Sequence, residues 1–223
     1  SWELRAGDID LDYCRQWGIR VAGTNERHSA VGIFDYLGDM AKHLIEQSGV
    51  DPAQPVVLLS NNDFGSYIER GLKKHGMAVV YNTFEKKSVI PRSIWRGIQD
   101  RIPRQKHRGM TDDSVSSVTV ILCMHPFDQC WVSEDGPIRS QDLLERYGKP
   151  YVLRFVGDVD TTSLDILNIP YWPKYVPPGH MGVLPSDIGY APVLKLQAAG
   201  LKVGELLLKG QKNFKEEPLV QNL

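Results

Sequence analysis

Short apolar runs alternate along this chain with segments of helical periodicity. The apolar runs span residues 56–59, 77–81, 118–124 and 151–156. Runs this short and this continuous are typical of strands that are buried on both faces of a parallel sheet. Residues 19–22 form a weaker run that predicts one further short strand.

Apolar residues recur every three or four positions in the segments between these runs. Helices are therefore predicted at residues 11–16, 29–47, 64–72, 141–147 and 187–208. Strands that alternate with helices favour an α/β fold in which a doubly wound parallel sheet carries helices on both faces, as in a Rossmann-like domain.

The turn after the first strand is the place where α/β folds of this kind bind ligands, because helix N-terminal amides point outward there. The dinucleotide fingerprint G-x-G-x-x-G falls on Ser60, Asn62 and Gly65. Only Gly65, which the fingerprint needs for close packing of helix on strand, is a glycine. Two readings stay open, a dinucleotide site formed by a changed turn and a Rossmann-like domain that binds no dinucleotide. The residues of the turn that would contact a cofactor are Ser60, Asn62, Asp63, Phe64 and Gly65.

The end of the second strand is where an acidic side chain holds the ribose hydroxyls of NAD. This chain has Asn82 there, with Lys86 and Lys87 shortly after it. Lysines suit a 2′-phosphate better than a free hydroxyl. The cofactor expected is thus NAD(P), with NADPH favoured, and the alternative is no dinucleotide at all.

Composition adds few constraints. The chain has 223 residues, of which 42% are hydrophobic and 24% are charged, and its net charge is −1. These values are ordinary for a globular protein and favour neither a nucleic-acid nor a membrane partner. The three cysteines are odd in number and lack a CxxC pattern, which favours a reducing, cytoplasmic location and argues against a metal site. Cys123 lies inside an apolar run and is expected to be inert.

Two stretches resemble the D-2-hydroxyacid dehydrogenase family. Residues 7–25, with Gly7-Asp8-Ile9-Asp10-Leu11 followed by Gly18-Ile19-Arg20-Val21 and Thr24-Asn25, are similar to the segment that closes its substrate domain. Residues 201–210 and 217–222 are similar to its final helix and its ending. The resemblance implies that residues 1–28 end a substrate-type domain, 29–185 form the nucleotide-binding domain with a basic insertion at 86–117, and 186–223 return to the first domain. It also implies that most of the substrate domain is missing or comes from a second polypeptide.

The resemblance further implies catalytic roles at the carboxyl ends of the later strands. His125 and Pro126 correspond to a turn over the nicotinamide side of the cofactor, and Arg154 corresponds to the arginine that holds the substrate carboxylate. His180, in Gly179-His180-Met181-Gly182, corresponds to the acid–base histidine of the family. Its imidazole suits that role, because imidazole transfers protons near neutral pH. The glutamate that tunes this histidine is absent, so either an aspartate such as Asp158 or Asp160 replaces it or the pair is incomplete. Arg154 paired to Asp158 as a structural arginine is the alternative.

The function predicted is therefore an NAD(P)-dependent oxidoreductase that acts on a small 2-oxo or 2-hydroxy acid. The alternative is a non-redox relative that binds another small ligand or acts as an assembly partner through the same crevice. A third candidate is an enzyme whose basic stretch 92–108 binds a phosphate or a nucleotide. Gly200 and Gly204 in the last helix allow close contact with another helix, which favours a homodimer.

Overall fold

A computed structural model describes residues 9–83, 118–209 and 217–221 of the chain. The basic stretch 92–108, Lys86 and Lys87 lie outside these residues. The chain divides into two compact units, one of residues 1–36 and 189–223 and the other of residues 37–188. Within the described residues no helix has the length and apolar character needed to cross a membrane.

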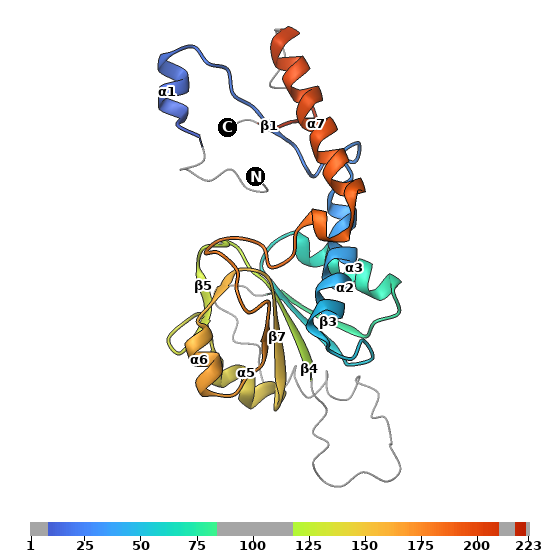
Figure 1. The fold of residues 1–223 in the computed structure, drawn as a ribbon, viewed down its shortest axis with the longest axis vertical. Coiled ribbons are helices and arrows are strands. Elements are labelled where there is room, and N and C mark those ends of the chain that lie inside the picture. The colour runs from blue at the N-terminus through green and yellow to red at the C-terminus, as the bar shows by residue number, and fades with distance from the viewer. Residues whose placement is uncertain (1–8, 84–117, 210–216, 222–223) are drawn as a thin grey trace. The chain divides into compact units, whose positions relative to one another are not determined.

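The larger unit is built on a parallel five-stranded sheet (Figure 1). Its strands, in chain order, are β2 (Val56–Ser60), β3 (Val79–Thr83), β4 (Val118–Cys123), β7 (Pro150–Val156) and β9 (Tyr171–Trp172). The spatial order is β3-β2-β4-β7-β9, and every neighbouring pair is parallel. The chain moves outward from β2 to β3 and resumes on the other side of β2 with β4. The point between β2 and β4 is therefore a topological switch point, where open α/β sheets bind ligands.

Helices cover both faces of this sheet. Figure 1 shows α2 (Leu37–Ser48) and α3 (Phe64–Lys74) on one side, and α5 (Ser140–Tyr147) and α6 (Thr161–Ile166) on the other. A small second sheet with the order β6-β5-β8 accompanies α5 and α6. Its strands are β5 (Cys130–Ser133), β6 (Ile138–Arg139) and β8 (Asp158–Val159), and the 3₁₀ turn η2 (Pro185–Ile188) ends the unit. These elements bear out the α/β prediction.

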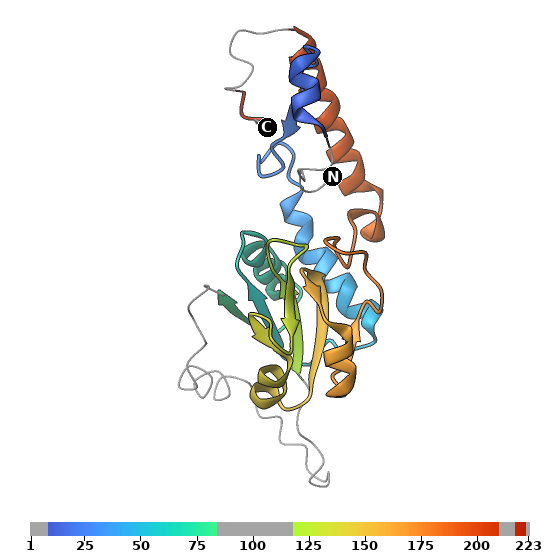
Figure 2. The ribbon, with the colours of Figure 1, turned by 90° about the vertical axis from the view of Figure 1, so that its left-hand side faces the viewer.

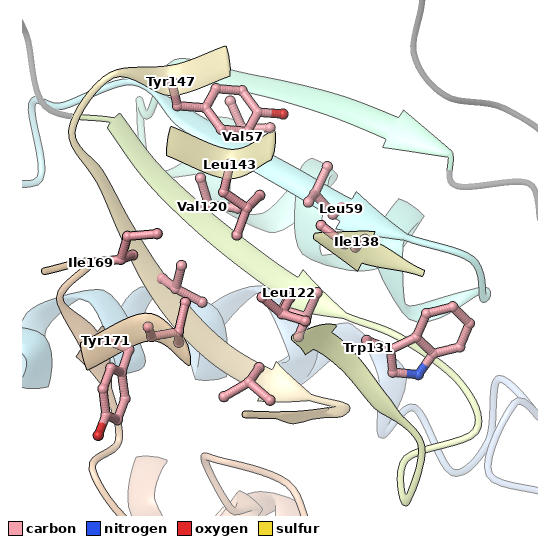
Figure 3. Close-up of a cluster of buried hydrophobic side chains, with 14 of the residues drawn as sticks. Val57, Leu59, Val120, Leu122, Trp131, Ile138, Leu143, Tyr147, Ile169 and Tyr171 are labelled. Carbon is pink, nitrogen blue, oxygen red and sulfur yellow. The ribbon is translucent and has the colours of Figure 1, made fainter. Parts of the chain in front are cut away.

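The central strands are buried on both faces, as their apolar runs predict. All residues of β2 and β4 are buried. Val57, Leu59, Val120 and Leu122 point toward α5 and β5, where they pack with Leu143, Tyr147 and Trp131 (Figure 3). Their neighbours in sequence, such as Leu58 and Ile121, must point to the opposite face, because side chains alternate along a strand. On that face α2 and α3 approach so closely that a Cβ on Gly38 would lie 2.4 Å from the Cα of Gly71.

The smaller unit holds both ends of the described chain (Figure 2). It contains α1 (Leu11–Gln16), β1 (Gly23–Thr24), the 3₁₀ turn η1 (Phe34–Tyr36), the long helix α7 (Tyr190–Lys209) and β10 (Val220–Gln221). Strand β1 pairs antiparallel with β10, and the Asn25 side chain donates to the carbonyl of Pro218 at 2.8 Å. The two stretches that carry the family resemblance at the ends of the chain thus pair with one another.

Three predicted boundaries are wrong. Residues 19–22 precede the strand, which is limited to Gly23–Thr24 because its partner is equally short. Residues 29–33 are not helical: Gly32 has φ of 59°, and regular α-helix begins only at Leu37. The last helix begins at Tyr190 rather than near Ser186, because Gly189 with φ of 114° separates it from η2.

Candidate functional site

Most of the residues predicted for the site lie near the carboxyl edge of the five-stranded sheet. Ser60 ends β2 as a fully buried strand residue, not as part of the turn as predicted, and Asn62, Asp63, Phe64 and Gly65 follow it. His125 and Pro126 follow β4, and Asp158 and Asp160 follow β7. In a parallel sheet all these strand ends point the same way, so the fold collects the residues at one edge.

Asn61 joins the two strands at the switch point. Its side-chain Nδ2 donates to the carbonyl of His125 at 2.7 Å, and its Oδ1 accepts from the backbone N–H of His125 at 2.8 Å. We call this reciprocal pair of bonds the Asn61 bridge. It ties the turn after β2 directly to the loop after β4. Nothing in the sequence singles out Asn61, because the glycine fingerprint falls on its neighbours.

Asn62 and Phe64 reinforce this connection. The Asn62 amide nitrogen donates to the carbonyl of Cys123 at 3.0 Å, and its oxygen accepts from the backbone N–H of Phe64, the first residue of α3. The Phe64 ring lies 6.1 Å from the ring of Phe127, in the loop after β4. Contacts within the protein therefore occupy the space between the two strand ends.

Gly65 has the packing role that its place in the fingerprint predicts. A Cβ at this position would lie 2.6 Å from the hydroxyl of Tyr81 and 2.7 Å from the side chain of Ser60. Such contacts are too short to accept, so only glycine lets α3 rest on β2 and β3. The space beside Gly65 is filled by protein and does not form an open cradle.

This turn fits a dinucleotide poorly. A pyrophosphate needs backbone that it can approach and backbone N–H groups that are free to bind it. In this turn the N–H groups of Asn62 and Phe64 already donate to the side chains of Ser60 and Asn62, and the N–H of Gly65 donates to the carbonyl of Asn62. Asn82 stands at the end of β3 as predicted, and its buried Nδ2 has no hydrogen-bond partner within the described residues. The assignment of these residues to a cofactor stays a prediction.

Arg154 is a buried cation on β7. The residue is 5% exposed, and its Nη2 donates to Oδ1 of Asp158 at 3.3 Å. Its Nε is buried and has no hydrogen-bond partner within the described residues. Burial lowers the pKa of the Arg154 guanidinium from its ordinary value, and the nearby Asp158 carboxylate opposes this shift. A buried guanidinium with one long hydrogen bond is poorly compensated, because a buried charge is costly unless it is paired and fully hydrogen-bonded.

Asp158 connects Arg154 to the loop that carries His180. Its Oδ2 accepts from the backbone N–H of Gly179 at 3.0 Å, while its Oδ1 accepts from Arg154. The same loop packs on β7 at Gly182, where a Cβ would lie 1.8 Å from the carbonyl oxygen of Arg154. The structural pairing of Arg154 with Asp158 that the sequence left open is thus present, and it also fixes the loop of His180.

His180 is exposed and has a defined tautomer. Its Nδ1 lies 3.0 Å from the carbonyl oxygen of Pro178. A carbonyl can only accept, so Nδ1 carries the proton, and Nε2 of the neutral ring is left as a proton acceptor. Within the described residues no carboxylate is hydrogen-bonded to the ring. Asp158 therefore orients the loop rather than the imidazole.

The remaining predicted residues have local roles. Asp160 caps α6, because its side chain accepts from the backbone N–H of Thr162 at 3.0 Å. His125 stacks edge-on against Phe127, with 5.9 Å between the ring centroids.

Cys123 is fully buried, and burial raises the pKa of its thiol to about 12, which agrees with the inert role expected for it. In the described parts of the chain no three acidic, histidine or cysteine side chains are grouped as a metal site would need.

A cavity of about 580 Å³ lies at the opposite edge of the sheet, near the amino ends of β7 and β9. Its lining includes Leu144, Tyr151 and Ile169. None of the residues predicted for the site lines it.

No family model, curated protein or solved structure matches this chain. These comparisons thus lend no support to the resemblance to D-2-hydroxyacid dehydrogenases, which stays a proposal.

Proposed function

We propose that this chain binds a small 2-oxo or 2-hydroxy acid at the carboxyl edge of its sheet, with Arg154 as the ligand of the carboxylate and His180 as the group that transfers a proton. The observation that carries the proposal is the buried guanidinium of Arg154, whose Nε has no partner within the described residues. A carboxylate is the natural complement, because it accepts two parallel hydrogen bonds from a guanidinium.

His180 supports the second half of the proposal. Its Nδ1 is held by a carbonyl and its loop is held by Asp158, so the position of Nε2, which has no hydrogen-bond partner among the described residues, is fixed. A neutral imidazole of this kind accepts a proton from the hydroxyl of a 2-hydroxy acid and returns it in the reverse direction. Asp158 is then a positioning residue, since it contacts Arg154 and Gly179 and not the imidazole.

The reaction class we favour is that of an NAD(P)-dependent oxidoreductase in a Rossmann-like fold. The parallel sheet with its switch point between β2 and β4 supports it. The poor fit of the turn between β2 and α3 to a pyrophosphate opposes it.

The second candidate is a non-redox relative that binds the acid without a dinucleotide. The Asn61 bridge favours it, because a ligand laid across the switch point would have to break two short hydrogen bonds. In this candidate Arg154 still binds the carboxylate of the acid, and no dinucleotide is bound.

Calorimetric titration separates the candidates. The protein is titrated with pyruvate, lactate and oxalate, and separately with NAD⁺, NADH, NADP⁺ and NADPH, while its thermal midpoint is followed. A ligand present at a hundred times its dissociation constant adds about 2.7 kcal/mol to the free energy of unfolding. Binding of both an acid and a dinucleotide supports the oxidoreductase, and binding of an acid alone supports the non-redox relative. Binding of no acid, with or without a dinucleotide, overturns the proposal.

A further inference from the structure

We propose that the outer face of α7 is the surface through which two copies of this chain associate. Leu194, Leu201 and Leu208 recur every seven residues along the helix and are 58%, 77% and 80% exposed. Residues seven apart lie on one side of a helix. Tyr190, one turn before Leu194, is 79% exposed on the same side. These four residues form the α7 stripe.

The α7 stripe is a second apolar face of a helix whose first face is already packed. Val203 and Leu206 form the inner cluster with Val220, and Ala22 and Leu219 pack against it. A surface helix needs only one apolar stripe to hold it on its own core. An inner cluster this small supplies little stability by itself, and small units of this kind gain from association.

The spacing of the stripe suits a second copy of the same helix. Leu194 and Leu208 lie the same number of residues before and after Leu201. An antiparallel pair related by a two-fold axis at Leu201 would therefore place Leu201 against Leu201, and Leu194 of each copy against Leu208 of the other. Such a contact is self-complementary and uses one patch twice, as a two-fold interface requires.

The surroundings of the stripe leave room for a neighbouring helix. Among the residues that the structure describes, no heavy atom lies within 4 Å of a Cβ added to Gly204, so these residues leave the space beside Leu201 and Leu208 open. Packed helices approach to about 8–10 Å between axes, and small residues favour the shorter distances. The adjacent Lys202 and Lys209 are already paired with Glu205 of their own helix.

The area agrees with a modest dimer. Covering four large side chains on each of two copies removes on the order of 1,000 Å² from water, near the lower limit for a specific interface. Exposed apolar patches of more than a few hundred Å² are also rare on proteins that stay monomeric. We therefore expect a dimer that dissociates on dilution.

Sedimentation velocity of the full chain over a wide concentration range tests the surface. The wild type is expected to change from monomer to dimer as its concentration rises. Leu201→Glu is expected to stay monomeric, and because Leu201 is 77% exposed, the substitution should not affect folding, which circular dichroism checks. Ile166→Glu, in α6 and 73% exposed, is the matched control and should dimerise like the wild type. A wild type that is monomeric throughout, or a Leu201→Glu variant that still dimerises, overturns the proposal.

Cysteine cross-linking tests the antiparallel pairing. In a background with Cys14→Ser and Cys130→Ser, Leu201→Cys should form a disulfide-linked dimer on mild oxidation, because the two copies of position 201 face each other. Leu194→Cys alone should cross-link poorly, whereas a mixture of Leu194→Cys and Leu208→Cys proteins should cross-link to each other. Efficient cross-linking of Leu194→Cys with itself would contradict this arrangement.

Discussion

Asn61 and His125 are joined by two reciprocal hydrogen bonds of 2.7 and 2.8 Å, although 64 residues separate them in the chain. The Asn61 side-chain amide both donates to and accepts from the backbone of His125, as a paired strand residue would. It thereby continues the pairing of β2 with β4 beyond the last strand residues. Replacing Asn61 by alanine should lower the free energy of unfolding by about 1–2 kcal/mol, since each bond contributes about 0.5–1.5 kcal/mol.

Urea unfolding followed by tryptophan fluorescence measures this loss. Asn61→Asp keeps the acceptor for the His125 N–H but sets a carboxylate oxygen against the His125 carbonyl, so it should also destabilise the protein. Asp128→Ala changes an exposed residue of the same loop and should have an effect within about 0.5 kcal/mol. Equal stabilities of Asn61→Ala and wild type would show that the bridge does not hold the two strand ends.

Gly65→Ala should destabilise the sheet unit by about 1–3 kcal/mol, because the added methyl group overlaps the Tyr81 hydroxyl and Ser60. Adding Tyr81→Phe removes one of the two obstacles, so the double variant should lose less than the sum of the single variants. Chemical denaturation of the four proteins gives this coupling. Strict additivity would mean that Tyr81 is not the obstacle. Lys74→Ala, at an exposed position of α3, serves as the control.

The buried thiol of Cys123 predicts a loss of stability at alkaline pH. Its pKa is raised by burial from 9.0 to about 12, so the folded chain keeps the thiol protonated over a range in which the unfolded chain ionises it. The contribution of this thiol to the free energy of unfolding is thus complete below pH 9 and is lost as the pH rises from about 9 toward 12. Tyr147, whose pKa burial also raises to about 12, adds to the loss above pH 10.

Urea midpoints at pH 8 and pH 10.5 test the assignment. The midpoint should fall between these values for the wild type and should fall less for Cys123→Ala. A variant with the same pH dependence as the wild type would place the titrating group elsewhere.

Asp158→Asn should destabilise the protein by about 3 kcal/mol, because it leaves the buried Arg154 guanidinium without its counter-charge. The same change weakens the acceptor that holds the Gly179 N–H, so the His180 loop should become more accessible to hydrogen exchange. Asp128→Asn is the matched exposed control and should leave both quantities unchanged. Faster exchange at Gly179 without loss of stability would mean that the carboxylate serves the loop and not the arginine.

Much of the fold could be predicted from the sequence, because buried parallel strands leave short, uninterrupted apolar runs such as Val56–Leu59. The boundaries of the smaller unit could not, since they depend on Gly32 and Gly189 in conformations that break a helical pattern, and on a partner strand only two residues long.

The candidate site was predictable in part. The place of Gly65 and Arg154 on their elements followed from strand and helix patterns, whereas the pairing of Arg154 with Asp158 was one of two alternatives that the sequence left open. The Asn61 bridge did not, because hydrogen bonds between a turn and a distant loop leave no periodic signal. The orientation of the His180 loop by Asp158 likewise depends on a contact across 21 residues that spacing alone does not reveal.

The proposal that Arg154 binds a carboxylate is tested most directly by nuclear magnetic resonance of the arginine Nε–H groups. The signal of Arg154 is assigned by its loss in Arg154→Lys, a variant that keeps the charge and lacks the planar fork. Titration with pyruvate or oxalate should shift this signal in a saturable way, because its buried Nε–H then gains an acceptor, while the signals of the exposed Arg139 and Arg15 serve as internal controls. A signal that does not move at saturating acid, with the protein folded, would contradict the account and leave Arg154 with a structural role only.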